Sequence, residues 1–389
     1  MRHRKDCGPS WKRVALKTLV TLALLMVVGQ ASLAWAQQGA LSVSAFSGGD
    51  REPAELLGQF RLKDFVLRPT LAVVDQEPVE LSLSHSSLAV SWWQEPDLSV
   101  HFRLGPRSLR NSPRWYGLEV EQREALSLHF VEAYVQRRWL NSQISLGLIP
   151  LKYSLEGALT EGDLVWPRGL LFSERWVGLR DYGLSWDSSH NGFFTRLNIH
   201  HGETSANLDG RYWFTGTWGW SDQRNLILGA SAQSGRTTAS STDPDGLGFE
   251  DLEAGRMAGF DPELPATWSQ GTVFLAWGQR RPRSWHLHSQ WTYLRRTQED
   301  FPDSERKRAL SGFQADLTYI WNEQLWSLLR YDRLENWRSW MGGLAWRSHS
   351  KTSSLIWLYS EKSLRGSTRQ EPERKLELQW RLSPLAQAL

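Results

Sequence analysis

The amino-acid sequence predicts an all-β protein, a transmembrane antiparallel β-barrel of about 16 strands. Three observations predict this fold class: apolar and polar residues alternate with a period of two, connections sort into short and long ones, and aromatic residues are abundant. Side chains on a strand point alternately to opposite faces, so an alternating segment has one apolar and one polar face. In a membrane barrel the apolar face meets lipid and the polar face lines the lumen.

The first 36 residues have the pattern of a secretory signal peptide. Basic residues precede an apolar run over residues 19–28, and the small-residue motif Ala34-Trp35-Ala36 follows it. A membrane-spanning helix needs about 20 apolar residues, which is longer than this run. We therefore expect export through a cleaved signal peptide, with an uncleaved membrane anchor as the alternative.

Removal of residues 1–36 reverses the charge balance. The chain has 45 Lys and Arg and 42 Asp and Glu, of which six basic residues and one acidic residue lie in the signal segment. The formal charge therefore changes from +3 to about −2, which gives no basic surface for nucleic acid. The one cysteine, Cys7, lies in the same segment, so we expect no disulfide or thiolate metal site in the mature chain. No cofactor is expected either.

Residues 37–78 have the least regular pattern after the signal segment. Pro53, Pro69 and Pro78 interrupt them, and residues 60–74 leave room for a strand or two. We expect a periplasmic N-terminal segment here and the barrel itself over residues 79–389.

Alternation is regular from Val79 onward. The segment Gln94-Glu95-Pro96-Asp97 forms a tight turn between the second and third predicted strands. The predicted strands span residues 79–84, 88–92, 98–104, 131–138, 142–149, 179–187, 193–200, 212–220, 225–233, 271–278, 284–295, 310–321, 325–333, 339–347, 353–361 and 375–382.

The connections between these segments alternate in length. Short links, such as residues 188–192, 221–224 and 322–324, alternate with long ones, such as residues 105–127, 151–178 and 234–270, and residues 334–338 are the exception. Outer-membrane barrels have short periplasmic turns and longer extracellular loops, whereas a soluble β-sandwich has no reason to sort its loops. The alternation therefore favours the barrel.

Aromatic residues also favour a membrane barrel. The chain has 23 Trp, 14 Phe and 9 Tyr, and many tryptophans lie on the apolar faces near strand ends, where the aromatic girdles of membrane barrels lie. The alternative is that the tryptophans stack on sugars, in a secreted Trp-rich β-sheet protein that binds carbohydrate.

One stretch of about 75 residues resembles the phosphate-selective porin O and P family. The resemblance rests on the order of five short motifs: Glu132-Ala133-Tyr134, Gly147-Leu148-Ile149-Pro150, Phe172-Ser173-Glu174-Arg175, Arg180-Asp181-Tyr182-Gly183-Leu184 and His201-Gly202. It implies a sixteen-stranded, often trimeric outer-membrane porin that passes small anions, in some members phosphate.

Two features depart from that family. Its chains end in an aromatic residue, whereas here a tail to Leu389 follows Trp380. Its phosphate-selective members line the lumen with arginines and lysines, whereas the polar faces here mix both signs of charge. The resemblance therefore does not carry phosphate selectivity over.

The candidate pore-lining residues are the charged and histidine side chains on the polar faces. Fixed cations in a channel wall lower the barrier for anions and raise it for cations. The alternative is that the arginines pair with neighbouring carboxylates and only stabilise the wall. The candidates are Arg103, Glu132, Arg138, Asp181, Arg196, His200, Asp316, Arg330 and Asp332.

The loop over residues 151–178 is a candidate for a segment that folds inward and narrows the pore. Its candidate constriction residues are Lys152, Arg168 and Arg175. A solvated outer loop is the alternative.

The sequence pattern does not support two other chemistries, metal binding and lipid hydrolysis. His286 and His288 project to one side of a strand, but no third ligand at suitable spacing accompanies them, so no metal site is predicted. A lipid-hydrolysing barrel would need Ser, His and a carboxylate or amide on the outer wall, and the polar residues here are expected to face inward. We therefore expect no enzymatic activity.

These patterns together favour an outer-membrane porin of a Gram-negative bacterium. We expect a passive channel for small hydrophilic solutes with a weak preference for anions. The expected partners are outer-membrane lipid, the solutes or anions and, by the family resemblance, two further copies in a homo-trimer.

Overall fold

A computed structural model describes most of the predicted barrel. Contacts divide the chain into two units, Met1–Ala54 and Glu55–Leu389, and every described residue belongs to the second. The signal segment and residues 37–58 lie outside the described part. The structure describes residues 59–74, 80–83, 86–105, 129–159, 164–173, 177–201, 212–222, 224–237, 266–278, 281–298, 307–335, 337–349, 353–364 and 372–382.

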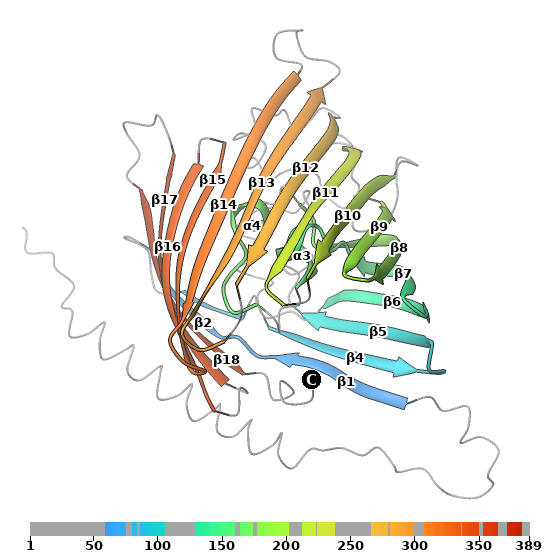
Figure 1. Cartoon of the computed structure of the whole chain (residues 1–389), viewed down its shortest axis with the longest axis horizontal. Helices are drawn as coiled ribbons and strands as arrows, with labels where there is room; N and C mark the ends of the chain where they lie inside the picture. The colour runs from blue at the N-terminus through green and yellow to red at the C-terminus, as the bar shows by residue number, and fades with distance from the viewer. Residues whose placement is uncertain are drawn as a thin grey trace, which may run out of the picture. The chain divides into compact units, whose positions relative to one another are not determined.

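The described chain is built almost entirely of antiparallel strand segments in one sheet (Figure 1). The segments are β1 (Gln59–Val66), β2 (Thr70–Val74), β3 (Glu80–Ser82), β4 (Ser87–Trp93), β5 (Leu98–Gly105), β6 (His129–Trp139), β7 (Ser142–Pro150), β8 (Arg180–His190), β9 (Phe193–His200), β10 (Trp213–Ser221), β11 (Leu226–Thr237), β12 (Ala266–Trp277), β13 (Ser284–Gln298), β14 (Lys307–Ile320), β15 (Leu325–Leu334), β16 (Trp337–Arg347), β17 (Ser353–Leu364) and β18 (Glu373–Leu382).

The eighteen segments form sixteen strands. β1 pairs with β4, and β2 pairs with β3 further along the same two chain segments, so β1 and β2 are parts of one strand and β3 and β4 are parts of the next. Thr70 pairs with Ser82 on one side and with Gln379 on the other, and Leu67 bridges Leu382. Since every other strand pairs with its neighbour in sequence, the pairings run in a complete ring.

The sheet begins at Gln59, twenty residues before the expected start at residue 79. The sequence analysis allows a strand over residues 60–74 but does not count it among the sixteen, and it divides the second strand into two, so the total of sixteen agrees although its members differ. A register shift between Leu62 and Asp64 disturbs the two-residue period. Pro69, which has no N–H to donate, interrupts the strand between β1 and β2.

Along the strands, apolar side chains are exposed and polar side chains are buried, which is the reverse of a soluble protein. On β13 and β15 the apolar Trp291 and Leu329 are 48% and 53% exposed, whereas the neighbouring Gln290 and Arg330 are 3% and 2% exposed. Soluble proteins bury their apolar side chains and expose their charged ones. The outer face of this barrel is therefore apolar and most polar side chains point inward.

Exposed tryptophans gather at one end of the barrel, where the short turns lie; we call it the short-turn end. They sit on the outer face beside a turn, as aromatic girdle residues do. Examples are Trp139, Trp186, Trp277, Trp285, Trp321 and Trp346.

The short turns are held by local hydrogen bonds. Between β10 and β11 the Asp222 carboxylate accepts the backbone N–H groups of Leu226, Arg224 and Asn225. These bonds to the charged form lower the pKa of Asp222 below its usual value. Asn322 accepts N–H groups in the same way before β15. Such Asx turns explain how a few residues reverse the chain.

The segment from residue 151 to 179, which we call the inner loop, connects β7 to β8. It contains two short helices, α3 (Ser154–Ala158) and α4 (Leu170–Ser173), which lie on the inner side of the curved sheet (Figure 1). Among the residues that the structure describes, no helix is long and apolar enough to cross a membrane.

The inner face also carries two apolar clusters, so the expectation that polar side chains line the lumen does not hold at these places. The inner loop supplies one side of each cluster and the strands supply the other. The first joins Tyr153, Leu170, Leu171, Phe172, Val177 and Leu179 to Trp213, Trp268, Leu294, Leu310 and Leu334, and the second joins Val165 and Trp166 to Ile320, Trp326, Leu328, Ala345, Ile356 and Leu358. Burial of each large apolar side chain contributes about 1.5–3 kcal/mol. The clusters therefore hold the loop firmly against the wall.

Candidate functional site

The inner loop starts and ends at the same place on the wall. Leu151 N–H donates to the Leu179 carbonyl at 2.9 Å, which closes the base of the loop. Asn198 of β9 donates to the Leu151 carbonyl at 2.9 Å, and the Lys152 ammonium pairs with Asp187 of β8. The loop therefore enters the barrel directly from β7 rather than extending away from it.

The first helix of the loop and the residue before it lie against β11 and β12. The Tyr153 hydroxyl bonds Thr272 Oγ1 of β12 at 2.8 Å, and Ser154 N–H donates to Ser231 Oγ of β11 at 2.9 Å. Burial raises the pKa of Tyr153, so its hydroxyl stays neutral and keeps this bond.

Glu156 of α3 reaches a buried arginine on the wall. Arg330 of β15 donates from Nη2 to Glu156 Oε1 at 2.9 Å, and from Nε and Nη2 to the two oxygens of Asp316 of β14 at 2.6 and 2.7 Å. His288 of β13 lies 3.2 Å from Asp316 through Nδ1. We call Glu156, His288, Asp316 and Arg330 the Asp316 cluster. It joins the inner loop to three strands.

Backbone groups of the loop complete this attachment. Arg330 Nη1 donates to the Pro167 carbonyl at 2.6 Å, and Gly169 N–H donates to Glu156 Oε2 at 3.0 Å. The Asp332 carboxylate is buried two residues along β15 and accepts the Leu170 N–H. Glu156, from the loop, and Asp332, from the wall, thus each accept a hydrogen bond that attaches the loop to β15.

A second charged cluster lies on the other wall. Glu132 of β6 accepts Arg180 Nε of β8 at 2.8 Å and pairs with Arg103 Nε of β5 at 3.1 Å, and all three side chains are buried. We call these residues the Glu132 cluster. β6 and β14 are eight strands apart in the ring of sixteen, so the two clusters face each other across the interior.

The row beside the Glu132 cluster explains the glycines of the predicted motifs. His101, Tyr134, Gly147, Gly183 and His200 pair successively across β5 to β9. Gly147 has φ +130°, and a Cβ there would lie 2.4 Å from the Ala133 carbonyl oxygen. Only glycine fits this position, because the backbone of Ala133 and Tyr134 lies too close for a Cβ.

The two predicted sites Asp181 and His200 are also paired. His200 Nδ1 lies 2.7 Å from Asp181 Oδ2, and His200 Nε2 lies 2.8 Å from Thr215 Oγ1 of β10. Both ring nitrogens are therefore engaged within the wall.

The remaining predicted residues lie apart from these clusters. Arg138 is exposed and its guanidinium stacks over Trp93, and Arg196 lies over the Phe194 ring. Arg168 is half-buried and donates to the Leu159 carbonyl at 2.9 Å within the loop. Arg175 lies outside the described residues.

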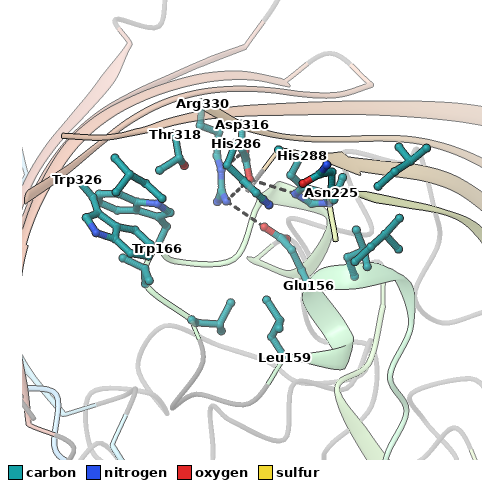
Figure 2. A pocket seen from close by; sticks show the side chains of 18 of the residues that line it. Glu156, Leu159, Trp166, Asn225, His286, His288, Asp316, Thr318, Trp326 and Arg330 are labelled. Atoms are coloured by element: carbon teal, nitrogen blue, oxygen red, sulfur yellow. Dashed lines mark hydrogen bonds and ion pairs between the residues drawn. The ribbon is translucent and has the colours of Figure 1, made fainter. Parts of the chain in front are cut away.

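A cavity of about 410 Å³ adjoins the Asp316 cluster toward the short-turn end (Figure 2). Its lining combines the charged Glu156, Asp316 and Arg330 with His286, His288 and the aromatic Trp166 and Trp326. Figure 2 shows Glu156 entering from the loop side and Arg330 and Asp316 from the wall. The cavity therefore lies between inner loop and barrel wall.

Sequence reasoning missed the contribution of Glu156. The pattern of β13 places His288 on the inner face, but the other residues near it come from β14 and from a loop far away in sequence. A register assignment for β13 and β14, in which His288 pairs with Asp316, would have identified half of this cluster.

No protein-family model and no curated protein matches the chain. Solved structures match its fold. An anion-selective porin from Comamonas acidovorans is 11% identical with a TM-score of 0.60, and the match covers 84% of this chain and 100% of the porin. The outer-membrane protein OmpT of Vibrio cholerae, in a trimer form, is 10% identical with a TM-score of 0.58, over 84% of this chain and 99% of that one.

A third solved structure has a comparable likeness. The outer-membrane channel DcaP of Acinetobacter baumannii is 10% identical with a TM-score of 0.56, and the match covers 87% of this chain and 100% of DcaP. At these identities the likeness concerns the fold. It confirms the predicted class, an all-β transmembrane antiparallel barrel, and porins are among the proteins that share it. The finer resemblance to the phosphate-selective porin O and P family is not confirmed.

Proposed function

We propose that this chain is an outer-membrane porin, a passive diffusion channel for small hydrophilic solutes. The observation that carries the proposal is the inverted wall, with an apolar outer face and an inner face rich in Ser, Thr, Gln and paired charges. Lipid-facing apolar residues and a polar interior are what a water-filled membrane barrel requires. The likeness in fold to solved porins supports the same function.

The proposed constriction is the space beside the inner loop. The loop crosses the interior from β8 to β15, so a solute has to pass between it and the wall. Lys152 at the base of the loop and Arg168 within it are the proposed constriction residues of the described part, and Arg175 completes the proposed set.

Weak anion preference is proposed for the wall that carries the Glu132 cluster. Two guanidiniums there face one carboxylate, which gives these three side chains a formal charge of +1. A fixed positive charge lowers the barrier for anions. The pairing of Arg103 and Arg180 with Glu132 limits the effect, so we propose a weak preference and no phosphate specificity.

Location and assembly complete the proposal. Both ends of the sheet, Gln59 and Leu382, lie at the short-turn end, which in outer-membrane barrels faces the periplasm. We propose that residues 1–36 direct export and are cleaved, and that three copies associate. The trimer form of the similar OmpT fold supports this assembly.

Planar-bilayer recording of the purified protein tests the function. We expect stable conductance steps and, in a salt gradient, a reversal potential that shows a small excess of anion current. Replacement Arg180→Gln should shift the reversal potential toward cations, because it removes one positive charge from the inner wall. Arg137→Gln, which changes a 58% exposed side chain, is the matched control.

The outcomes separate the parts of the proposal. Folded protein that gives no conductance steps would contradict the channel. A reversal potential near zero with normal steps would leave the channel and remove the anion path. A phosphate competition series then reports whether phosphate competes with chloride more than other anions do.

A further inference from the structure

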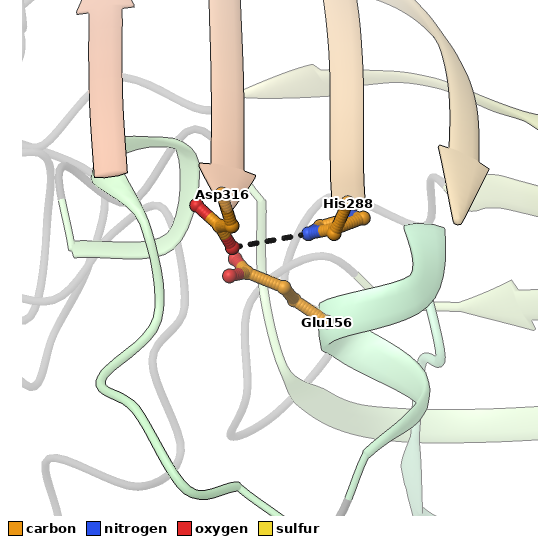
Figure 3. Close-up of side chains that lie close together, drawn as sticks. All are labelled: Glu156, His288 and Asp316. Atoms are coloured by element: carbon orange, nitrogen blue, oxygen red, sulfur yellow. Dashed lines mark hydrogen bonds and ion pairs between the residues drawn. The ribbon is translucent and has the colours of Figure 1, made fainter. Parts of the chain in front are cut away.

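We infer that the Asp316 cluster binds a divalent transition-metal ion such as Zn²⁺, held by Glu156, His288 and Asp316. Figure 3 shows these side chains converging from α3, β13 and β14. One ligand atom from each residue lies within 4.8 Å of the others, and all three residues are buried. The inference does not depend on whether the barrel transports solutes.

The donor set suits a transition metal rather than calcium or magnesium. Zn²⁺ binds imidazole nitrogen and carboxylate oxygen, whereas Ca²⁺ and Mg²⁺ take oxygen ligands. Two ligand atoms on tetrahedral zinc are about 3.4 Å apart, given bonds of about 2.1 Å. The three groups therefore have to converge by about 1 Å, which side-chain rotation in a cavity allows.

One ring nitrogen of His288 has no hydrogen-bond partner among the described residues. His288 is 8% exposed, and its Nε2 has no hydrogen-bond partner in the described structure. Without a metal, Nδ1–H donates to Asp316 Oδ2 at 3.2 Å. In the tautomer that carries the proton on Nε2 instead, Nδ1 presents a lone pair to a metal beside Asp316. An unpaired buried ring nitrogen is costly unless something occupies it.

Neighbouring groups hold the two carboxylates in place. Gln314 Nε2 donates to Glu156 Oε1 at 2.8 Å and to Asp316 Oδ2 at 3.1 Å, while Arg330 donates to both carboxylates. Among these oxygens, Glu156 Oε2 accepts one hydrogen bond, from Gly169 N–H, and keeps a lone pair for a metal. Both Asp316 oxygens already accept two or more donors, so a metal there would take the place of the Gln314 amide. Hydrogen bonds of this kind orient the ligands in protein metal sites.

Charge balance favours a cation at this position. Glu156 and Asp316 are buried carboxylates, and Arg330 is the cation that contacts both of them. These three side chains have a formal charge of −1, and buried charge without a partner is unfavourable. A bound cation offsets this charge, and the adjoining cavity provides access and space for a water ligand.

The metal would attach the inner loop to the wall. Glu156 belongs to the loop, whereas His288 and Asp316 belong to two adjacent strands. A ligand that binds only the folded state stabilises it by mass action. We therefore expect Zn²⁺ to raise the unfolding temperature of the chelator-treated barrel.

The test uses the full mature protein in detergent, treated with a chelator and then titrated with Zn²⁺ or with Co²⁺, whose visible absorption reports its ligands. We expect stoichiometric binding by the wild type. His288→Gln should weaken the binding more than about 10-fold, since loss of even a supporting residue has an effect of this size. His286→Gln is the matched control, because His286 lines the same cavity from the same face of β13.

Three results would overturn the inference: no Zn²⁺ binding by the folded wild type, equal loss in both histidine variants, or a Co²⁺ spectrum that His288→Gln does not change. Heat-dependent gel mobility shows whether each variant is folded. If His288→Gln fails to fold, Glu156→Gln removes a ligand from the loop side and should weaken binding to a similar extent. Undiminished binding by that variant would also contradict the site.

Discussion

The two charged clusters on opposite walls of the barrel are built in different ways. In the Glu132 cluster, Arg180 and Glu132 are 48 positions apart and all three residues belong to strands of one wall. In the Asp316 cluster, Arg330 and Glu156 are 174 positions apart, and the pair joins a strand to the inner loop. The first cluster therefore connects neighbouring strands, whereas the second fixes what lies inside the barrel.

The clusters also differ in the sign of their charge. Two guanidiniums surround one carboxylate at Glu132, whereas one guanidinium contacts two carboxylates at Asp316. Loss of one arginine therefore has unequal consequences. Glu132 would keep a partner, but Glu156 and Asp316 would lose the only guanidinium that contacts them among the described residues.

The largest expected effect is that of Arg330→Met. The replacement leaves two buried carboxylates without their cation, and breaking a buried ion pair in this way costs about 3–5 kcal/mol. Urea unfolding of the barrel in lipid vesicles, followed by gel mobility, measures the loss in free energy of unfolding. A loss below about 1 kcal/mol would mean that the cluster does not stabilise the fold.

A smaller effect is expected for Arg103→Met. Arg180 remains 2.8 Å from Glu132, so the carboxylate stays paired and the loss should be about 1–3 kcal/mol. The same unfolding assay applies. If the losses for Arg103→Met and Arg330→Met were equal, the contrast between the two clusters would be refuted.

The exposed pair of Arg137 and Asp97 provides the control for both variants. Its atoms are 3.4 Å apart, and the two side chains are 58% and 39% exposed. Ion pairs in water contribute less than about 1 kcal/mol, so Arg137→Gln should leave the free energy of unfolding almost unchanged.

The sequence predicts the strands well where one face is clearly polar. β14 shows this, because Gln314, Asp316 and Thr318 alternate with exposed apolar residues such as Phe313 and Leu317. Prediction is weaker at the first strand, where a register shift and Pro69 disturb the period. It is also weaker on β17, where Ile356 and Leu358 face inward as apolar residues because the inner loop covers them.

The candidate site is only partly predictable, because the two-residue period reports which face a side chain is on but not which residues it contacts. Alternation tells which side chains face inward, so Asp316, Arg330 and Asp332 were among the predicted residues and all are buried. Their partners depend on strand register and on the path of the inner loop, which local periodicity does not specify. Glu156, the residue that joins loop and wall, could therefore not be predicted from its neighbours in sequence.

The most direct test of the account compares single-channel conductance in the wild type and in a variant with a shortened inner loop. Leu151 and Leu179 are hydrogen bonded at 2.9 Å, so a short Gly-Ser linker can replace residues 155–176 without moving β7 or β8. We predict conductance steps in both proteins and larger steps in the shortened one, because the loop occupies part of the interior. Equal conductance, or no conductance in a folded barrel, would contradict the account.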